Sequence, residues 1–460
     1  MLKKMMSTSA HSLYYRSPVF VQHAFTSAYG FKKRRERYND YYHEAFRRYV
    51  TEDSGGREPL IRLMHHLKDN IVAYRDIDVD EETIMESYLA LPMTEKEDLR
   101  RELDDRSHKE GKLHVSRTGG TTGYNLAVFE SEEDWALRMA YLDYIKYRQG
   151  IEPFSKRASF TGREITPAVH RNKLWRYNLA MNQALYASHH MTPENVEHVY
   201  ENMKRFRPVS IDGLPSSIHM VAKYMLSNGL RADWDVKAVF PTAEILLPYA
   251  KRDIEAAFDT VVIDQYASSE GAPFLYGNTD EGYTIGHETG LFEFERRGEH
   301  RYEMIVTSFL NYATPLVRYR IGDEVEIHSD REYLNSYEDD IIIRRIYGRR
   351  MDYLIAQDGR KVMNIILAWI VDGFEEKVVQ CQIVQKEKEE FQVNMVVEDD
   401  YDEHADELVI RGRLERQLGP DNRYVFNYMD FIPKEKNGKV RFIINELEQK
   451  AGAGSTAEFG

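Results

Sequence analysis

The sequence predicts an α/β fold in which a large N-terminal α/β domain is followed by a smaller, mobile C-terminal α+β lid domain. Three observations support this fold class. The chain has 460 residues, which exceeds the usual size of a single domain. Segments typical of strands and of helices alternate between residues 111 and 347, as they do in α/β domains. After Arg349 this alternation gives way to a hairpin, a helix and a strand.

These patterns divide the chain into four parts. We expect residues 1–110 to form a helical N-terminal part of the large domain and residues 111–350 to form its α/β core. Residues 351–450 are expected to form the lid domain. Residues 451–460 are small and polar, which is typical of a flexible tail.

Local signals place several elements along the chain. In the N-terminal part, four aromatic residues at helical spacing predict a core stripe: Tyr38, Tyr41, Tyr42 and Phe46. Ser131, with Asp134 three residues later, predicts the start of a helix through a capping box. The apolar segment from Thr260 to Ile263 predicts a short strand that runs directly into polar residues, which is the usual ligand position in an α/β sheet.

The C-terminal part has its own sequence pattern. Residues 378–384 and 391–397 alternate like the two strands of a hairpin, 403–418 resemble a helix, and 424–432 resemble a strand. Together they predict a compact α+β unit.

Composition excludes several classes of protein. The chain has 62 Lys and Arg against 76 Asp and Glu, a net charge of −14, which disfavours a general nucleic-acid or anionic-membrane surface. We therefore expect no nucleic-acid partner. No run of about 18 apolar residues predicts a membrane span, and the start of the chain lacks the apolar core of a secretory signal, so a cytoplasmic location is expected. The one cysteine, Cys381, excludes an intrachain disulfide and a Cys-rich zinc site, and its apolar surroundings predict a buried strand position.

The most informative segment is Ser-Arg-Thr-Gly-Gly-Thr-Thr-Gly at residues 116–123. Glycines allow backbone N–H groups to turn toward an anion, and threonine hydroxyls add donors, so the segment is suited to phosphate oxygens. It lacks the Gly-Lys-Ser/Thr ending of a Walker A loop, which indicates a different nucleotide-binding fold with its lysine supplied from elsewhere. An exposed hairpin turn is the alternative interpretation.

Four more segments follow this loop in order. They read Asp-Gln-Tyr-Ala-Ser-Ser-Glu-Gly at 264–271, Pro-Leu-Val-Arg-Tyr-Arg-Ile-Gly-Asp at 315–323, Gly-Arg-Arg-Met-Asp at 348–352 and Pro-Lys-Glu-Lys-Asn-Gly-Lys-Val-Arg at 433–441. In this order the five segments resemble the motifs of the adenylate-forming superfamily of acyl- and aryl-CoA ligases. Within it the chain is most similar to the phenylacetate–CoA ligase-like branch, which includes the CapK-type proteins. The resemblance runs from about residue 90 to about residue 445.

This resemblance implies an enzyme that uses ATP and Mg²⁺ to convert a small-molecule carboxylic acid into an adenylate, with release of pyrophosphate. Transfer to coenzyme A would follow after the lid domain rotates. Two alternatives stay open: a CoA-independent adenylyltransferase or amide ligase of the CapK-type branch, and a degenerate adenylate-binding protein without catalysis. No zinc is expected, and the sequence leaves the acid and the oligomeric state open.

The resemblance also assigns roles to residues of the nucleotide site. Tyr266 would stack on adenine, Ser269 would contact the α-phosphate, and Glu270 would hold Mg²⁺, a hard cation that prefers carboxylate and phosphate oxygens. For Ser269 and Glu270 a helix cap is the alternative. The residues that would surround the β- and γ-phosphates are Thr118, Gly119, Gly120, Thr121, Thr122 and Gly123.

Further residues are assigned in the same way. Asp323 would accept the ribose hydroxyls, with a turn position as its alternative, and Arg349 would reach the ribose. The segment that contains Glu244 resembles one that flanks adenine in the superfamily. An acidic residue that stabilises a helix N-terminus is an equally good explanation for Glu244. Asp352 falls near the hinge acid of the superfamily, with a solvated surface position as its alternative. Lys439 would move in from the lid domain and bridge the carboxylate and the α-phosphate.

Three positions depart from the superfamily pattern. Tyr124-Asn125 follows the phosphate loop where Lys-Pro is usual, and Ala267 replaces a glycine. Met351 occupies one of the two positions where the hinge acid usually stands. The first and last departures support the alternative of a degenerate binding protein, whereas the presence of Glu270, Asp323 and Lys439 supports catalysis.

Overall fold

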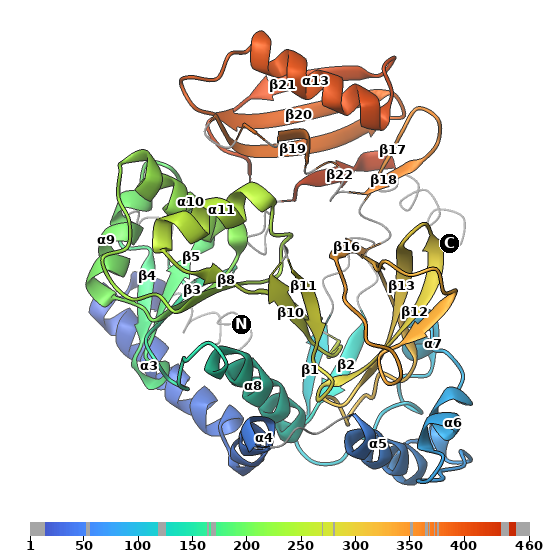
Figure 1. The fold of residues 1–460 in the computed structure, drawn as a ribbon. Coiled ribbons are helices and arrows are strands. Elements are labelled where there is room, and N and C mark those ends of the chain that lie inside the picture. Colours follow the sequence, from blue (N-terminus) through green and yellow to red (C-terminus); the bar gives the residue numbers. More distant parts are fainter. Residues whose placement is uncertain are drawn as a thin grey trace, which may run out of the picture. The chain divides into compact units, whose positions relative to one another are not determined.

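The structure is a computed structural model, and it describes residues 14–51, 56–117, 126–162, 165–166, 172–268, 270–278, 281–349, 353–363, 367, 369–371, 373–374, 377–433 and 441–447. The contacts within the chain separate two compact units. The first comprises Met1–Gly30, Phe154–Ile263 and Arg350–Gly460, and the second comprises Phe31–Pro153 and Asp264–Arg349. Helices and several sheets alternate along the chain, so the predicted α/β fold class is confirmed (Figure 1).

Helices dominate the N-terminal part, as predicted. They are α3 (Val19–Arg37), α4 (Asp40–Thr51), α5 (Arg57–Asn70), α6 (Ile84–Leu89) and α7 (Lys96–Arg101). The predicted aromatic stripe is only partly correct. Tyr42 is buried and donates a hydrogen bond of 2.9 Å to Asp143 Oδ2, but Tyr41 is 50% exposed. Adjacent residues of a helix point about 100° apart, and the buried face of α4, which carries Tyr42, Ala45 and Tyr49, does not extend to Tyr41.

Besides the helices α4 to α7, the described residues of the second unit form three sheets and a further helix, α8. The antiparallel pair β1 (His114–Arg117) and β2 (Ala127–Glu130) leads into α8 (Glu132–Tyr147). Ser131 caps α8, because its hydroxyl accepts from Asp134 N at 3.1 Å while the Asp134 carboxylate accepts from Ser131 N at 2.7 Å. The predicted capping box is therefore confirmed.

The larger sheets of this unit are antiparallel. One has the order β11-β10-β9, with β9 (Asp264–Tyr266), β10 (Leu275–Asn278) and β11 (Gly282–Ile285). The other has the order β15-β12-β13-β14-β16. Its strands are β12 (Gly290–Gly298), β13 (Arg301–Ser308), β14 (Tyr319–Glu326), β15 (Tyr333–Asn335) and β16 (Arg345–Arg349). Its core includes Phe292, Phe294, Tyr302, Met304 and Val306.

The first unit contains a six-stranded sheet of order β4-β5-β3-β6-β7-β8. Its strands are β3 (Arg157–Thr161), β4 (Trp175–Asn178), β5 (Gln183–Ala187), β6 (Ser210–Gly213), β7 (Ala238–Pro241) and β8 (Val261–Val262), all parallel except the edge strand β4. The helices of this part are α9 (Val196–Phe206), α10 (Pro215–Ser227) and α11 (Pro248–Phe258), and Figure 1 shows α10 and α11 side by side. Every residue of β7 is buried, as in strands covered on both faces. The strand predicted at Thr260–Ile263 is confirmed as β8, which continues directly to β9.

The described residues of the C-terminal part form a sheet of order β21-β20-β19-β22 and include the helix α13. Its elements are β17 (Tyr353–Ile355), β18 (Lys361–Met363), β19 (Val378–Glu387), β20 (Glu390–Val397), α13 (Ala405–Leu418), β21 (Arg423–Tyr428) and β22 (Ile443–Asn445). The predicted hairpin, helix and strand are confirmed as β19–β20, α13 and β21. Cys381 is buried in β19, as predicted.

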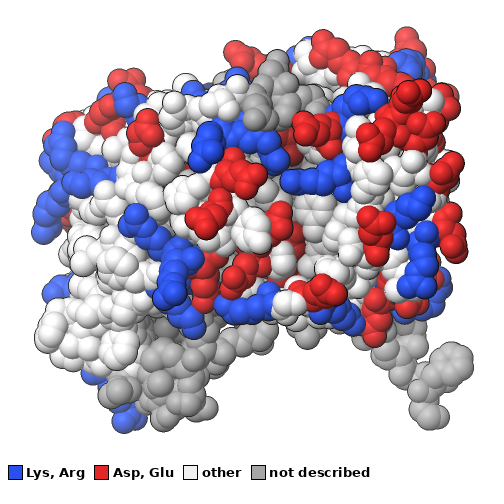
Figure 2. Space-filling view, turned by 90° about the horizontal axis from the view of Figure 1, so that it is seen from below, with Lys and Arg blue, Asp and Glu red and all other residues white. Residues whose placement is uncertain are grey.

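Acidic and basic side chains lie intermixed on the face of the molecule shown in Figure 2. Among the described helices, none combines the length and the apolar character that crossing a bilayer requires.

Candidate functional site

The candidate site is built around the segment that follows β8. In β9, Asp264 is held by the Tyr283 hydroxyl, which donates to its Oδ2 at 2.5 Å. Burial raises the pKa of the Asp264 carboxyl, and the hydrogen bond from Tyr283 partly offsets this rise. Tyr266 ends β9 and pairs with Leu275 of β10. The side chain of Tyr266 is thereby fixed on a short, hydrogen-bonded strand.

Tyr266 and Asp323 meet although they are 57 residues apart. The Tyr266 hydroxyl donates a hydrogen bond of 2.5 Å to Asp323 Oδ2. Asp323 lies on β14 and is 8% exposed. Gly322 before it has φ +81°, a conformation that favours glycine. The structure therefore joins two of the predicted nucleotide-binding residues directly.

Arg349 lies opposite Asp323 in the pairing of β14 with β16. This register places the backbone of Arg349, a third predicted residue, directly beside Asp323. The Arg349 side chain lies outside the described part of the structure.

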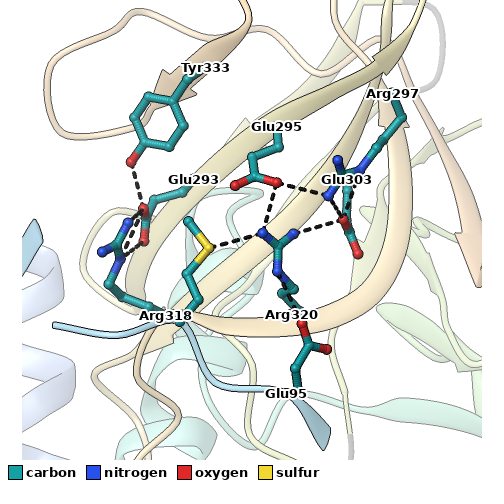
Figure 3. A network of polar contacts seen from close by, with 9 residues as sticks. Glu95, Glu293, Glu295, Arg297, Glu303, Arg318, Arg320 and Tyr333 are labelled. Carbon is teal, nitrogen blue, oxygen red and sulfur yellow. Dashed lines mark hydrogen bonds and ion pairs between the residues drawn. The ribbon is translucent and has the colours of Figure 1, made fainter.

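Two arginines anchor β14 and the residue before it in the sheet (Figure 3). Arg318 pairs with the Glu293 carboxylate, with Nη2 2.7 Å from Oε2, and also donates to the carbonyls of Leu89 and Leu91. The hydroxyls of Tyr88 and Tyr333 donate to the same carboxylate. Breaking a buried ion pair by removing one partner typically costs about 3–5 kcal/mol, so this network holds β14 firmly in register.

Arg320 extends the network on β14 itself. Its guanidinium lies 2.8 Å from Glu303 Oε2, 2.8 Å from Glu295 Oε2 and 3.2 Å from Glu95 Oε1. Arg297 also pairs with Glu303, as Figure 3 shows. Because these groups fix the start of β14, they also fix the position of Asp323 three residues further along.

The turn after β9 carries Glu270. Ser268 Oγ accepts a hydrogen bond of 3.1 Å from Ala272 N, and the Ser308 hydroxyl donates to the Gly271 carbonyl at 2.5 Å. Glu270 is 4% exposed, and none of the other described residues donates a hydrogen bond to its carboxylate or forms an ion pair with it. A buried carboxylate is unfavourable unless a cation or donors compensate its charge. The position of Glu270 therefore fits a cation ligand.

Mg²⁺ can be bound by one or two carboxylates together with phosphate oxygens and water. In the described part of the chain, no three His, Cys, Asp or Glu side chains come together to hold a metal.

Glu244 lies in the first unit, and its carboxylate has a structural partner. Its Oε2 accepts a hydrogen bond of 3.0 Å from Ser216 N in the first turn of α10. Anionic side chains are favourable at this end of a helix. The preceding residue, Ala243, has φ +73°, an uncommon conformation for a residue other than glycine.

Several predicted site residues lie outside the described part of the structure. They are Thr118, Gly119, Gly120, Thr121, Thr122, Gly123, Ser269, Asp352 and Lys439. The strands β1 and β2 that flank the glycine and threonine loop are described, with Arg117 paired to Ala127 next to it.

Sequence reasoning missed two polar residues beside the Glu270 turn. Arg138 of α8 and Asn311, which follows β13, both approach Gly271. Neither lies in a recognisable motif, since one is in the middle of a helix and the other in an irregular connection, so no local signal identifies them.

Comparison with known proteins identifies a family match, a sequence relative and similar solved structures. Residues 354–446 match the family described as the CapK C-terminal domain. The chain is 32% identical over 447 residues to Protein CapK of Staphylococcus aureus, a match that covers 95% of this chain and 99% of that protein.

Among solved structures, the chain is similar to 2-hydroxyisobutyryl-CoA ligase in the postadenylation state in complex with R3-HIB-AMP. The TM-score is 0.64 and the identity 16%, over 87% of this chain and 91% of the ligase. The complex of the same ligase with 2-HIB-AMP gives the same values. At this identity the similarity shows a shared fold, which is that of an adenylate-forming ligase with a large N-terminal and a smaller C-terminal domain.

Proposed function

The chain belongs to the CapK family and has the fold of adenylate-forming ligases, and on this premise we propose that it activates a carboxylic acid with ATP. A carboxylate oxygen attacks the α-phosphorus and the bond from this phosphorus to the bridging oxygen of the β-phosphate breaks. The products are an acyl- or aryl-adenylate and pyrophosphate. Negative charge grows on the phosphates in this reaction, so preorganised donors and a cation are required.

The hydrogen bond between Tyr266 and Asp323 is the observation that carries the proposal. It joins the two segments that would bind the nucleoside. In this proposal the Tyr266 ring stacks on adenine while the Asp323 carboxylate accepts from the ribose hydroxyls, with Arg349 nearby on β16. The Arg318 and Arg320 pairs support these roles because they prevent β14 from shifting.

Glu270 is assigned to Mg²⁺, which would neutralise charge on the phosphates when bound. A buried carboxylate without a described partner supports this role. Ser269 would contact the α-phosphate, and the loop of residues 118–123 would bind the β- and γ-phosphates. Glu244 would border adenine, although its hydrogen bond to Ser216 N also gives it a purely structural role.

Lys439 would supply the cationic group beside the α-phosphate and the attacking carboxylate. We further propose that residues 351–450 act as a mobile lid and that Asp352 lies at its hinge. Rotation of such a lid would let one site perform adenylation and then transfer to an acceptor. Coenzyme A is the proposed acceptor, because 2-hydroxyisobutyryl-CoA ligase, a solved structure with this fold, is a CoA ligase.

The test is ATP–pyrophosphate exchange with a panel of aryl and acyl carboxylic acids, followed by mass spectrometry with and without coenzyme A. We expect exchange that depends on an acid, and a thioester when coenzyme A is added. Exchange without a thioester would favour the CoA-independent ligase. ATP binding without exchange for any acid would favour a degenerate binding protein, and no affinity for adenine nucleotides would refute the proposal.

A further inference from the structure

One arm of the Arg138 guanidinium is paired with a carboxylate, and the other arm has no partner among the residues that the structure describes. Its Nη1 lies 3.0 Å from Glu130 Oε1. Glu130 is 1% exposed, and its other oxygen, Oε2, accepts hydrogen bonds from Trp135 Nε1, at 3.0 Å, and from the Ser116 hydroxyl. The other arm, Arg138 Nη2, is buried and has no hydrogen-bond partner among the described residues.

Asn311 shows the same division between its two polar atoms. Its side chain is fully buried, and its Oδ1 accepts a hydrogen bond of 2.9 Å from Thr314 N. Its Nδ2 is buried and likewise lacks a partner in the described part of the chain. Buried donors of this kind are rare in folded proteins, because leaving one unsatisfied is costly.

Both unsatisfied donors approach the same point beside Gly271. A Cβ at Gly271 would lie 2.8 Å from Arg138 Nη2 and 3.5 Å from Asn311 Nδ2. Gly271 has φ +95°, and the absence of a side chain leaves room for the guanidinium. Two donors from distant segments of the chain therefore converge next to Glu270, the residue before Gly271.

The combination of groups indicates the chemistry of a ligand. A guanidinium arm and an amide N–H suit an anion with several oxygens, such as a phosphate. Glu270 would repel that anion unless a divalent cation lay between them. A diphosphate group bound to Mg²⁺ meets both conditions, because the metal bridges the carboxylate and the phosphate oxygens.

We propose that Arg138 Nη2 and Asn311 Nδ2 bind the magnesium-bound diphosphate group, which is the β,γ part of ATP before the reaction and pyrophosphate after it. This inference rests on the proposed function and adds two residues that lie in none of the five motifs. Glu130 acts as a positioning residue, because its pair with Nη1 directs the other arm of Arg138 toward Gly271. The adenosine part of the nucleotide does not contact this pair of donors.

The test is calorimetry with three probes, MgATP, magnesium pyrophosphate and AMP. Arg138→Lys keeps the charge beside Glu130 but removes the second arm. Asn311→Leu is similar in size to the native residue and removes the amide donor. Charge-assisted hydrogen bonds of this kind are typically worth about tenfold or more in affinity. We therefore expect each variant to bind magnesium pyrophosphate and MgATP about tenfold or more weakly, with AMP affinity unchanged.

Arg148→Gln is the matched control, since Arg148 is the exposed C-cap residue of the same helix and its guanidinium donates a hydrogen bond of 2.9 Å to the Tyr276 hydroxyl. It should bind all three probes like the native protein. Thermal unfolding shows whether the Asn311→Leu variant is folded. If this variant does not fold, the Arg138→Lys variant provides the test.

The outcomes separate this inference from the proposed function. Native affinity for magnesium pyrophosphate in Arg138→Lys would overturn the inference and leave the proposed function standing. An equal loss of AMP and pyrophosphate affinity would also overturn it, because the two residues would then have only a structural role. If the native protein binds neither ATP nor pyrophosphate, the proposed function itself is refuted.

Discussion

The hydroxyl of Tyr266 donates a hydrogen bond of 2.5 Å to Asp323 Oδ2, which ties the end of β9 to the middle of β14. Each residue comes from a separate motif of the sequence, and their contact places an aromatic ring beside a buried carboxylate. The two side chains are therefore expected to depend on each other in stability and in nucleotide binding.

A double-mutant cycle with Tyr266→Phe and Asp323→Asn measures that dependence. Hydrogen bonds to charged groups contribute about 1.5–3 kcal/mol, so we expect a coupling free energy of roughly 1–2 kcal/mol in urea unfolding. Tyr266→Phe keeps the ring and should retain most of the ATP affinity, whereas Asp323→Asn should lose it. Additive effects of the two changes on the free energy of unfolding would contradict the contact.

Glu270→Gln should separate the cation role from stability. Because the native carboxylate is buried without a described partner, the neutral amide should raise the free energy of unfolding by about 1 kcal/mol in the absence of ligand. The same change should remove the increase in thermal midpoint that MgATP gives the native protein. Glu299→Gln, at an exposed position, is the control and should keep that increase. A full MgATP effect in Glu270→Gln would exclude Glu270 as the metal ligand.

Gly271→Ala should destabilise the protein for two reasons. Its φ of +95° strains an alanine, and the new methyl group would lie 2.8 Å from Arg138 Nη2. We expect a loss of about 1–3 kcal/mol in the free energy of unfolding. Gly359→Ala is the matched control, with φ +85° and no atom within 4 Å of the new carbon, so it reports backbone strain alone. Equal losses in the two variants would show that the approach of Arg138 is not tight.

His23 should make stability dependent on pH. Burial, together with Arg176 and Lys173, lowers the pKa of its imidazole to about 4. Between pH 6.5 and pH 4 the unfolded chain therefore binds a proton that the folded chain does not, so this residue lowers stability progressively as the pH falls through that window. In His23→Gln the side chain can still accept from Tyr177 N but does not titrate. Its thermal midpoint should fall less between pH 7 and pH 4.5, and identical midpoint curves would contradict the prediction.

Lys439→Ala tests the catalytic assignment in the C-terminal part. Removing one preorganised charge beside the reacting phosphate typically costs about 10²–10³ in rate, so adenylation should fall by at least about 100-fold while ATP still binds. Lys388→Ala changes an exposed lysine in the β19–β20 turn and should leave the rate unchanged. Activity that survives the loss of Lys439 would show that the catalytic cation lies elsewhere.

The amino-acid sequence by itself determined the types of element and the order of the motifs. The capping box at Ser131 and the β19–β20 hairpin follow from residues close together in the chain, and local periodicity reports such features directly. The prediction that Tyr41 belongs to the core stripe is wrong, because periodicity shows which residues share a helix face but not how wide the buried part of that face is.

Only the tertiary structure decided which side chains meet. The hydrogen bond between Tyr266 and Asp323 depends on how β9 lies against β14, and the approach of Arg138 and Asn311 to Gly271 depends on the packing of α8 beside that turn. Neither contact leaves a local pattern in the sequence, because packing between distant segments is set by the summed burial and hydrogen bonding of the whole unit and not by the residues next to each other in the chain.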